Sequence, residues 1–485
     1  MDRRALSLCP PSNLTILLLI LIVSLAAWPI PGWGQVYLPN FKFIEVPDPL
    51  SGDNPTYPLI TRTEPTPGQS WTDSRFGTAQ TRITQTATLV QEYSRIDPFN
   101  CNQSLILLFD LVSGSGLVYR TTSAPYDTLA NLVQTISDLG EMRWDPSDPN
   151  ILWGFKGLTI TKLDVTTGVE TLVKDFTTDA AIVPILQAYP LIYRITCMDE
   201  GESSRDKRFW ALALQNGASS NPDLDYAYLY LFTWDRLQNE VLGTYALSVA
   251  QRQNLDWVGI STLGNWVVIG GESDGGMPSN WGLIMASKDF KVLHQLSVNT
   301  GHADVGLDTQ GREVIVMQNS NTDCVDLIPL DLQAKPVNIV DDYNGNIIRP
   351  IVRLYYNSGS PIGFNGGVHI SCNYPGYSLI STTIPPSTPE QNWLDRCNIL
   401  VRLDRNKARA VYLAKVYNTT QQYWEETHAS ITNDGAKIVW EDDWGHSVPD
   451  TQPPALTVTQ LVMPPNWQKQ FTHPVPAIPS LLLGD

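Results

Sequence analysis

The sequence predicts an all-β fold, a single β-propeller of about seven blades, from three observations. Short segments rich in Val, Ile, Leu, Tyr and Trp follow one another from residue 76 to residue 463, as strands do. Turns that contain Asp, Asn, Gly or Pro separate these segments. The turns recur in the same order with a period of roughly 45 to 65 residues, the range of propeller repeats. We therefore expect one ring rather than several domains.

Seven repeats account for this periodicity, although six or eight blades also fit the spacing. Residues 76–90 are expected to supply a strand that helps close the ring, because unpaired strand edges favour aggregation. The repeats begin near Ile96, Glu141, Arg208, Asp256, Gly301, Gly367 and Thr427.

The ends of the chain differ from the propeller region. A basic start and the apolar run at 14–23 predict a signal peptide over residues 1–34, with cleavage after Gly34. The run is shorter than the ~20 residues of a usual membrane span, so an uncleaved anchor is the less favoured alternative. Residues 35–75 hold seven prolines and predict an extended arm over the surface. Residues 464–485 form a C-terminal tail. The mature protein is expected to be secreted, periplasmic or extracellular.

Charge and cysteine content restrict the partners. The formal net charge of −17 argues against binding to nucleic acid or to an anionic membrane. A polysaccharide or an extracellular protein is the expected partner. Five cysteines lie beyond residue 34, and Cys372 with Cys397 is the pair favoured for a disulfide, unless all five are buried thiols. No motif of serine hydrolases, zinc proteases or nucleotide-binding proteins occurs.

Three of the six histidines occupy one structural position. His302, His369 and His428 each begin a predicted innermost strand, so they should surround the mouth of the central channel on one face. Neutral imidazoles are common ligands of divalent cations. The pattern predicts a site for one divalent cation, manganese or calcium, with Gln318 or Asp304 completing the ligand set. The alternative, that each histidine braces a turn or the next blade, is about as well supported.

Other polar and aromatic residues are predicted on the same face. Glu141 and Arg143 begin the second repeat, and Arg143 is the candidate catalytic base or substrate clamp. Glu141 and Asp304 are candidate substrate-binding residues, together with Trp257, Trp444 and His446. Tryptophans in such loops can stack on sugars.

The histidine arrangement resembles that of oligogalacturonate-lyase-type propellers. The segments 143–146, 301–306 and 428–435 also resemble secreted propellers of the TolB/WD40-like type. The first resemblance implies a manganese held largely by histidines and β-elimination on a uronic-acid polymer. The lyase pattern, however, places two metal-binding histidines and a glutamine close together in one blade, whereas His369 stands alone in its segment.

Two functions therefore remain open from the sequence. The first is a propeller that binds a glycan or another extracellular ligand at the channel mouth and cleaves uronic-acid polysaccharide with the help of a metal ion. The second is a non-catalytic extracellular binding or scaffold propeller. A cofactor-dependent oxidoreductase ranks below both, because no motif in the sequence distinguishes it.

Overall fold

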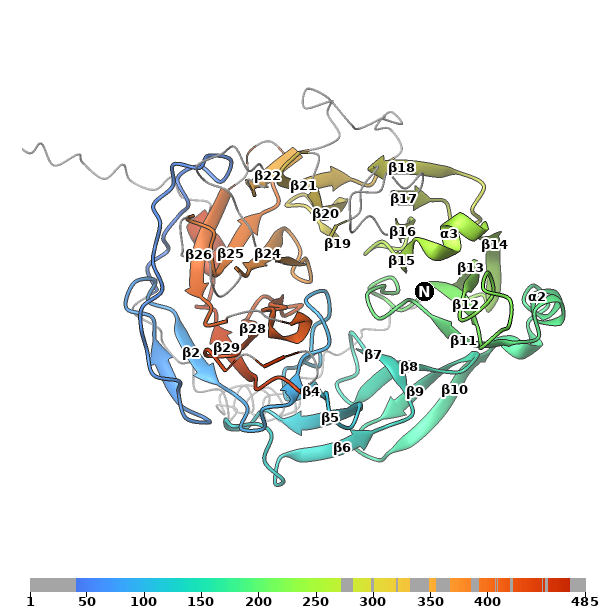
Figure 1. Ribbon diagram of the computed structural model, residues 1–485, viewed down its shortest axis with the longest axis horizontal. Helices are drawn as coiled ribbons and strands as arrows, with labels where there is room; N and C mark the ends of the chain where they lie inside the picture. The colour runs from blue at the N-terminus through green and yellow to red at the C-terminus, as the bar shows by residue number, and fades with distance from the viewer. Residues whose placement is uncertain are drawn as a thin grey trace, which may run out of the picture. The chain divides into compact units, whose positions relative to one another are not determined.

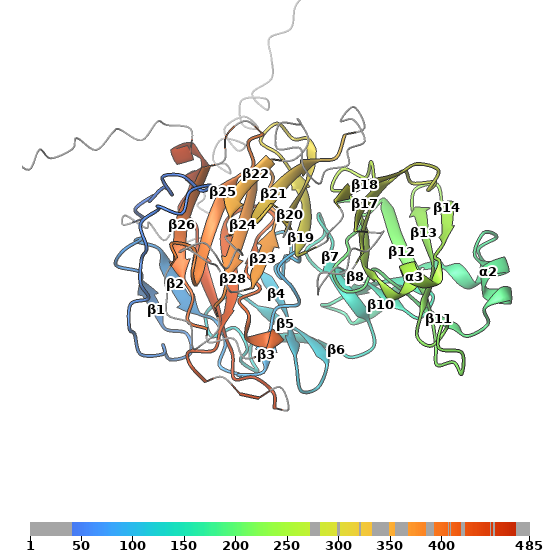
Figure 2. The same ribbon diagram turned by 45° about the horizontal axis from the view of Figure 1, so that its top comes forward.

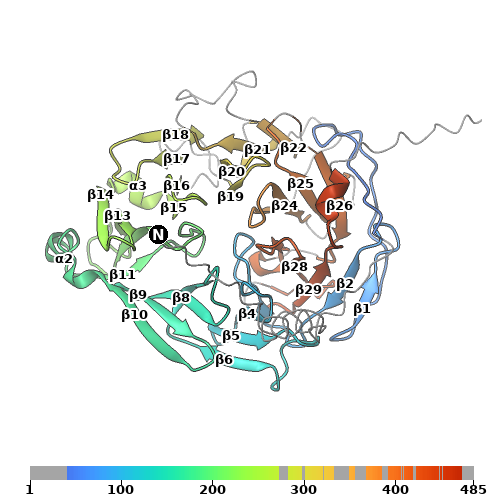
Figure 3. The same cartoon turned by 180° about the vertical axis from the view of Figure 1, so that it is seen from behind.

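A computed structural model describes residues 41–271, 282–297, 301–319, 322–331, 349–354, 367–384, 392–405, 407, 409–418, 422–446, 448–449 and 452–471. Within them, seven antiparallel sheets follow one another around a central axis (Figure 1). The same ring is seen from behind in Figure 3. The predicted all-β, seven-bladed propeller is thus confirmed. The predicted signal peptide lies outside the described residues.

Each of the first six blades has four strands in sequence order, with the first strand innermost. The first three blades comprise β3 (Leu89–Val90), β4 (Leu105–Asp110), β5 (Ser115–Arg120) and β6 (Leu132–Ile136); β7 (Gly140–Trp144), β8 (Ile151–Lys156), β9 (Thr159–Asp164) and β10 (Val169–Asp175); and β11 (Ile192–Thr196), β12 (Phe209–Asn216), β13 (Tyr228–Asp235) and β14 (Glu240–Ala246). The next three comprise β15 (Leu255–Ile260), β16 (Val267–Gly271), β17 (Leu283–Ala286) and β18 (Leu293–Ser297); β19 (Ala303–Leu307), β20 (Glu313–Asn319), β21 (Cys324–Pro329) and β22 (Arg349–Arg353); and β23 (Val368–Ser371), β24 (Tyr377–Thr382), β25 (Cys397–Arg402) and β26 (Arg409–Lys415).

The seventh blade joins the two ends of the described chain. It contains β27 (Ser430–Ile431), β28 (Lys437–Asp442) and β29 (Thr457–Val462), followed by β2 (Ala79–Arg82) and β1 (Ser70–Thr72). β2 pairs with β29 through the Thr81–Gln460 register, which closes the ring as expected for residues 76–90. Two short helices, α2 (Val183–Ala188) and α3 (Val249–Gln253), lie outside the sheets (Figure 2).

Burial of both sheet faces explains why these segments are strands. Along β12, Trp210, Leu212 and Leu214 join the core between the second and third blades. The alternate residues Ala211 and Ala213 join the core between the third and fourth blades. A period of two with apolar residues on both faces is the pattern of a strand buried between two packed sheets.

The N-terminal arm continues along the outer edge of the sixth blade. Glu45 forms a bridge with Val411 in β26, and Val46 donates a backbone hydrogen bond to Ala410. At the other end of the chain, Trp467 and Phe471 are buried in the core beside the sixth and seventh blades. No helix among the described residues is long and apolar enough to cross a membrane.

Three sequence expectations are wrong in detail. The innermost strand of the third blade is β11, so the predicted start at Arg208 is in fact the beginning of the second strand. The first blade begins at Leu89 rather than Ile96. Cys372 and Cys397 are free thiols. Cys372 follows one end of β23, whereas Cys397 begins β25 two strands away at the other end, too far apart for a disulfide.

Candidate functional site

A segment of the first blade leaves its sheet and crosses to the other blades. After β3 the chain departs at Gln91 and returns to pair with β4 at the Phe99–Ile106 bridge. We call residues 91–97 the channel segment. Its Tyr93 and Arg95 are 4 % and 3 % exposed, although the segment has no regular secondary structure.

The channel segment contacts blades on all sides of the axis. Gln91 donates its backbone N–H to Glu441 of the seventh blade (2.8 Å), and Arg143 of the second blade donates to Glu92 (2.7 Å). Arg95 pairs with Glu200, in the loop after β11, at 2.7 Å. These contacts with separate blades place the segment in the centre of the ring.

The three predicted histidines meet around this segment. The ring centroids of His302 and His369 are 4.6 Å apart, and those of His369 and His428 are 4.2 Å apart. Tyr93 lies against all three rings, at 6.5, 5.7 and 5.7 Å between centroids. Three consecutive blades thus bring their imidazoles to one point, and we call these rings with Glu426 the histidine cluster.

One nitrogen of each ring is fixed by the protein. The Tyr93 hydroxyl lies 2.8 Å from Nδ1 of His302. Nε2 of His369 lies 2.5 Å from a carboxylate oxygen of Glu426, and His428 is hydrogen-bonded to the backbone of Glu426. Nδ1 of His369 and Nε2 of His428 are buried and have no hydrogen-bond partner among the described residues.

This pattern resembles that of metal-binding imidazoles. In such sites the ring nitrogen that does not bind the ion donates to a carboxylate or a carbonyl, which fixes the tautomer and the ring orientation. Ligand atoms of His369, Glu426 and His428 all lie within 4.8 Å of one another. Bonds of about 2.1 Å to one ion require ligand atoms within about 4.2 Å of one another, a spacing that these three residues approach. His302 does not belong to this group of three; its ring lies beside that of His369.

The histidines are held in the form that can bind a cation. Burial lowers the pKa of His302 to about 3, and the charges of His369 and Arg95 act in the same direction. Burial and the charge of Arg95 lower the pKa of His369 to about 3. Burial also lowers the pKa of His428, because a buried imidazolium loses its hydration. All three rings are therefore neutral near pH 7.

His428 also has an unusual backbone. Its φ of 38° lies in the left-handed region, which side chains other than glycine, asparagine and aspartate seldom adopt. It is 2 % exposed. A conformation of this kind costs about 1–3 kcal/mol and is found most often at functional positions.

Two predicted substrate-binding residues face neighbouring blades instead. A carboxylate oxygen of Asp304 accepts the backbone N–H of Cys372 (2.5 Å), so this side chain joins the fifth blade to the sixth. Trp257 is 2 % exposed and its ring lies 4.3 Å from the Arg95 guanidinium. Its face is therefore covered. Gln318 lies beside the cluster in the sheet, where its N–H donates to the His302 carbonyl (2.7 Å).

Glu141 and Arg143 fix loops rather than facing the three rings. Glu141 accepts hydrogen bonds from the hydroxyl of Thr196 and, at 2.8 Å, from the backbone N–H of Cys197. Arg143 binds Glu92 and the Asp199 carbonyl. The charge of Glu92 raises the pKa of Arg143 against the effect of burial, so the guanidinium stays protonated and does not accept a proton.

Trp444 and His446 lie beside the N-terminal arm. Trp444 stacks on Tyr417 with 4.1 Å between ring centroids, and His446 pairs with Glu64 of the arm at 2.9 Å. The loop that carries them therefore meets the arm, and neither side chain has a contact with the three rings among the described residues.

The sequence prediction missed Tyr93 and Glu426. Glu426 stands two residues before His428, a spacing that is detectable once His428 is suspected as a ligand. Tyr93 gave no signal, because nothing in the sequence shows that residues 91–97 leave the sheet.

A cleft of about 1070 Å³ adjoins the cluster. Tyr93, which lies against the three rings, also lines this cleft. The rings of Tyr423 and Trp424, which line it too, lie 4.9 and 6.1 Å from the His428 ring. Glu92 lines the same cleft. Burial raises its pKa to about 7, although the charge of Arg143 opposes this. The cleft therefore contains the aromatic side chains of Tyr423 and Trp424 and, in Glu92, a carboxyl group with a pKa of about 7.

Comparison with known proteins identifies the fold but not a family. No family model matches the sequence, and no curated protein matches it. An oligogalacturonate lyase from Vibrio parahaemolyticus superposes with a TM-score of 0.51 at 11 % identity, over 82 % of this chain and 98 % of the lyase.

Two further propellers are more distant. The β-propeller domain of Myceliophteria thermophila Cps50 (Swd1) gives a TM-score of 0.38 at 9 % identity, over 79 % of this chain and 98 % of that domain. The tricorn protease gives 0.39 at 10 % identity, over 79 % of this chain and 35 % of the protease. The chain is therefore a seven-bladed β-propeller similar in fold to an oligogalacturonate lyase.

Proposed function

We propose that the protein binds one divalent cation, manganese or calcium, through His302, His369 and His428, and binds a glycan in the adjoining cleft. The observation that carries this proposal is the convergence of three neutral imidazoles, two of them with a buried nitrogen that has no hydrogen-bond partner within the described ranges. Glu426 adds a carboxylate within 4.8 Å of the ligand atoms of His369 and His428. Nitrogen and carboxylate ligands together suit manganese well and calcium less well.

We further propose that the glycan is a uronic-acid polysaccharide and that the reaction is β-elimination. Similarity of fold to a protein named oligogalacturonate lyase supports this choice of substrate class. A bound divalent cation would neutralise the sugar carboxylate and make the adjacent C–H more acidic. The proton would pass to a base, the bond between the β carbon and the leaving oxygen would break, and that oxygen would take up a proton from the protonated base or from water. Two shorter sugars would result, one of them with a carbon–carbon double bond.

Glu92 is the best candidate for the base. A carboxyl group with a pKa of about 7 is both partly ionised and a useful proton acceptor at neutral pH. Arg143 holds it in place through the 2.7 Å ion pair. Arg143 therefore has a positioning role in this proposal rather than a catalytic one.

Tyr423 and Trp424 are the residues proposed to stack on sugar rings. Tyr423 is 47 % exposed and both side chains line the cleft next to His428. They take the role first predicted for Trp257 and Trp444, whose faces are covered by Arg95 and Tyr417. Export through the segment at residues 1–34 would place this cleft where extracellular polysaccharide is found.

Release of unsaturated sugar tests this function. The full chain, loaded with manganese, is incubated with polygalacturonate, and the ultraviolet absorbance of the unsaturated product is followed. We expect activity in the wild type, loss of at least a hundredfold in His428→Ala, and no loss in the control His446→Ala, whose ring pairs with Glu64. Absence of product from several uronate polymers at any metal loading would overturn the lyase proposal.

A non-catalytic binding propeller is the second candidate. The contacts of Glu92 favour this candidate. Glu92 accepts a hydrogen bond from Arg143, and it belongs to the channel segment, which is held by contacts with several blades. Binding of polygalacturonate that requires His428 but yields no product would select this alternative.

A further inference from the structure

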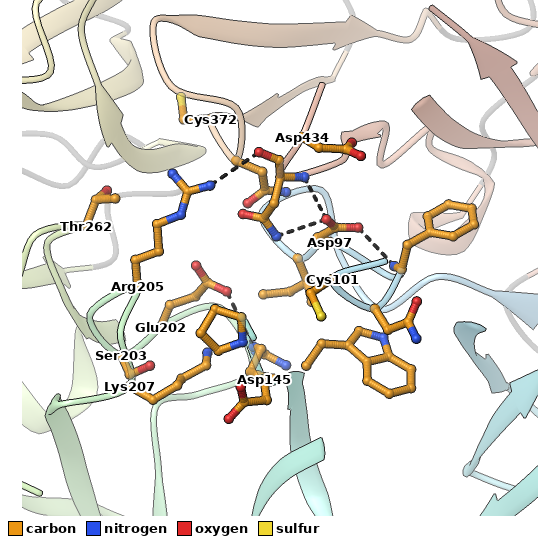
Figure 4. Close-up of a pocket in the computed structure, with 18 of the residues that line it drawn as sticks. Asp97, Cys101, Asp145, Glu202, Ser203, Arg205, Lys207, Thr262, Cys372 and Asp434 are labelled. Carbon is orange, nitrogen blue, oxygen red and sulfur yellow. Dashed lines mark hydrogen bonds and ion pairs between the residues drawn. The ribbon is translucent and has the colours of Figure 1, made fainter. Parts of the chain in front are cut away.

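The opposite face of the ring contains a second cavity, of about 250 Å³. Its walls come from loops between the first and second strands of several blades, which leave the sheets at the end away from the histidine cluster. Figure 4 shows Glu202, Arg205 and Lys207, all from the loop between β11 and β12, around this cavity. Its volume equals that of roughly eight water molecules, enough for a monosaccharide-sized compound.

Lys207 is the unusual residue of the cavity. It is 7 % exposed, and among the described residues its ammonium group forms no hydrogen bond or ion pair but lies 5.9 Å from the centroid of the Trp210 ring. Burial lowers its pKa. A mostly buried ammonium with only this weak contact is stabilised when an anion joins it. Lys207 also has a φ of 57°, a conformation that suits glycine or asparagine better.

Two of the four carboxylates that line the cavity, Asp97 and Asp145, already have donors from the protein. Asp97 accepts from Phe99 and Asn433, and Asp145 accepts from Ser147 and Trp153. Burial raises the pKa of Asp97 to about 7, so part of it is neutral at that pH.

The two remaining carboxylates are also engaged. Asp434 accepts from Gln103 and Ala436. Glu202 forms an ion pair of 4.0 Å with Nε of Arg143, a buried nitrogen for which the described residues offer no hydrogen bond. The negative charge of Glu202 raises the pKa of Lys207, but by less than burial lowers it.

Two cationic groups are therefore left for a ligand. In the part of the chain that the structure describes, Lys207 has no hydrogen-bond or ion-pair partner, and the guanidinium of the exposed Arg205 makes a 3.2 Å hydrogen bond to the Asn433 carbonyl. An ammonium and a guanidinium that line one cavity match a carboxylate, which can receive donors on both oxygens. The nearby carboxylates disfavour a doubly charged anion such as phosphate.

We propose that this cavity is a second ligand site, which binds a small organic carboxylate of monosaccharide size through Lys207 and Arg205. The site is separate from the histidine cluster and does not depend on the function proposed for it.

Calorimetric titration of the full chain tests the site, with D-glucuronate as the probe, and with D-glucose and inorganic phosphate as comparison ligands. We expect the wild type to bind glucuronate at least tenfold more tightly than either comparison ligand. Lys207→Met, which keeps the length of the side chain and removes the charge, should weaken binding at least tenfold. The matched control Lys288→Met should not, since Lys288 is also partly buried with a lowered pKa but does not line the cavity.

Two further measurements separate the alternatives. The titration is repeated on metal-free and on manganese-loaded protein, and the binding that depends on Lys207 should be the same in both. Glucuronate binding that appears only with manganese and is retained in Lys207→Met would overturn the proposal and assign the binding to the histidine cluster. Without ligand, Lys207→Met should melt at the same temperature as the wild type or higher, because an unpaired buried charge has been removed. A clear fall in melting temperature with unchanged affinity would make Lys207 structural. If this variant does not fold, Arg205→Gln should weaken binding severalfold, and an unchanged affinity would overturn the proposal.

Discussion

His369 couples the cluster to the stability of the fold. Its side chain is fully buried and its pKa is lowered from 6.5 to about 3. The unfolded chain takes up a proton at this ring below pH 6.5, whereas the folded chain does not. The neutral His369 ring therefore makes its full contribution to the free energy of unfolding above pH 6.5. As the pH falls from 6.5 toward 3, this contribution is lost at up to about 1.4 kcal/mol per pH unit.

We therefore expect His369→Gln to make stability less sensitive to acid. Urea unfolding of metal-free protein at pH 7, 6 and 5 measures this. The wild type should lose stability relative to the variant at each step. Parallel losses in the two proteins would show that the ring is protonated in the folded state.

Tyr93 fixes one ring of the cluster through a single hydrogen bond. Tyr93→Phe frees Nδ1 of His302, and loss of such a bond around a metal site typically weakens metal binding by ten- to a hundredfold. The cost in stability should be only about 1 kcal/mol. The control Tyr126→Phe removes a similar buried bond, to Gln460, and should leave metal affinity unchanged. Equal metal affinities in wild type and Tyr93→Phe would separate Tyr93 from the site.

The positions of the histidines were predictable from the sequence, whereas their partners were not. His302, His369 and His428 follow from the blade period, since each precedes or begins an innermost strand. Contacts such as Tyr93 with His302 join residues more than two hundred positions apart, and no local pattern encodes them.

At the level of elements, the channel segment is the main departure from the regular blade pattern. It interrupts the innermost strand of the first blade between Val90 and Phe99. The corresponding loop of the third blade, between β11 and β12, is also long and supplies Glu200 to Arg95. Both loops lengthen their repeats. A prediction from a regular period therefore put the starts of these two blades too late in the chain, at Ile96 and Arg208.

The buried ion pair of the channel segment should contribute strongly to stability. Arg95→Met leaves Glu200 without its 2.7 Å partner and removes the contact with Trp257. Loss of one partner of a buried pair costs about 3–5 kcal/mol, and the 22 % exposure of Glu200 favours the lower end. The control Lys156→Met breaks exposed pairs with Asp138 and Glu170 and should cost much less. Equal costs in urea unfolding would contradict the structural role of the segment.

For the whole molecule, the closing strand makes the ring one cooperative unit. β2 joins β29, and Ile83 next to it is fully buried and donates its N–H to Val458. A chain that begins at residue 85 should therefore expose the edge of β29 and aggregate. A synthetic peptide of residues 68–84, added during refolding, should restore a soluble monomer, whereas a peptide with Ile83→Asp should not. Light scattering measures both, and a soluble monomer without any peptide would show that closure is dispensable.

Elemental analysis can show whether the histidine cluster holds a cation, when the purified full chain is exposed to manganese, calcium or zinc and excess ion is removed. We expect about one bound ion per chain in the wild type and in the control His446→Ala. We expect no bound ion in the triple variant His302→Ala, His369→Ala, His428→Ala. No bound ion in the wild type with any of the three metals, or an ion retained by the triple variant, would contradict a cation site at the histidine cluster.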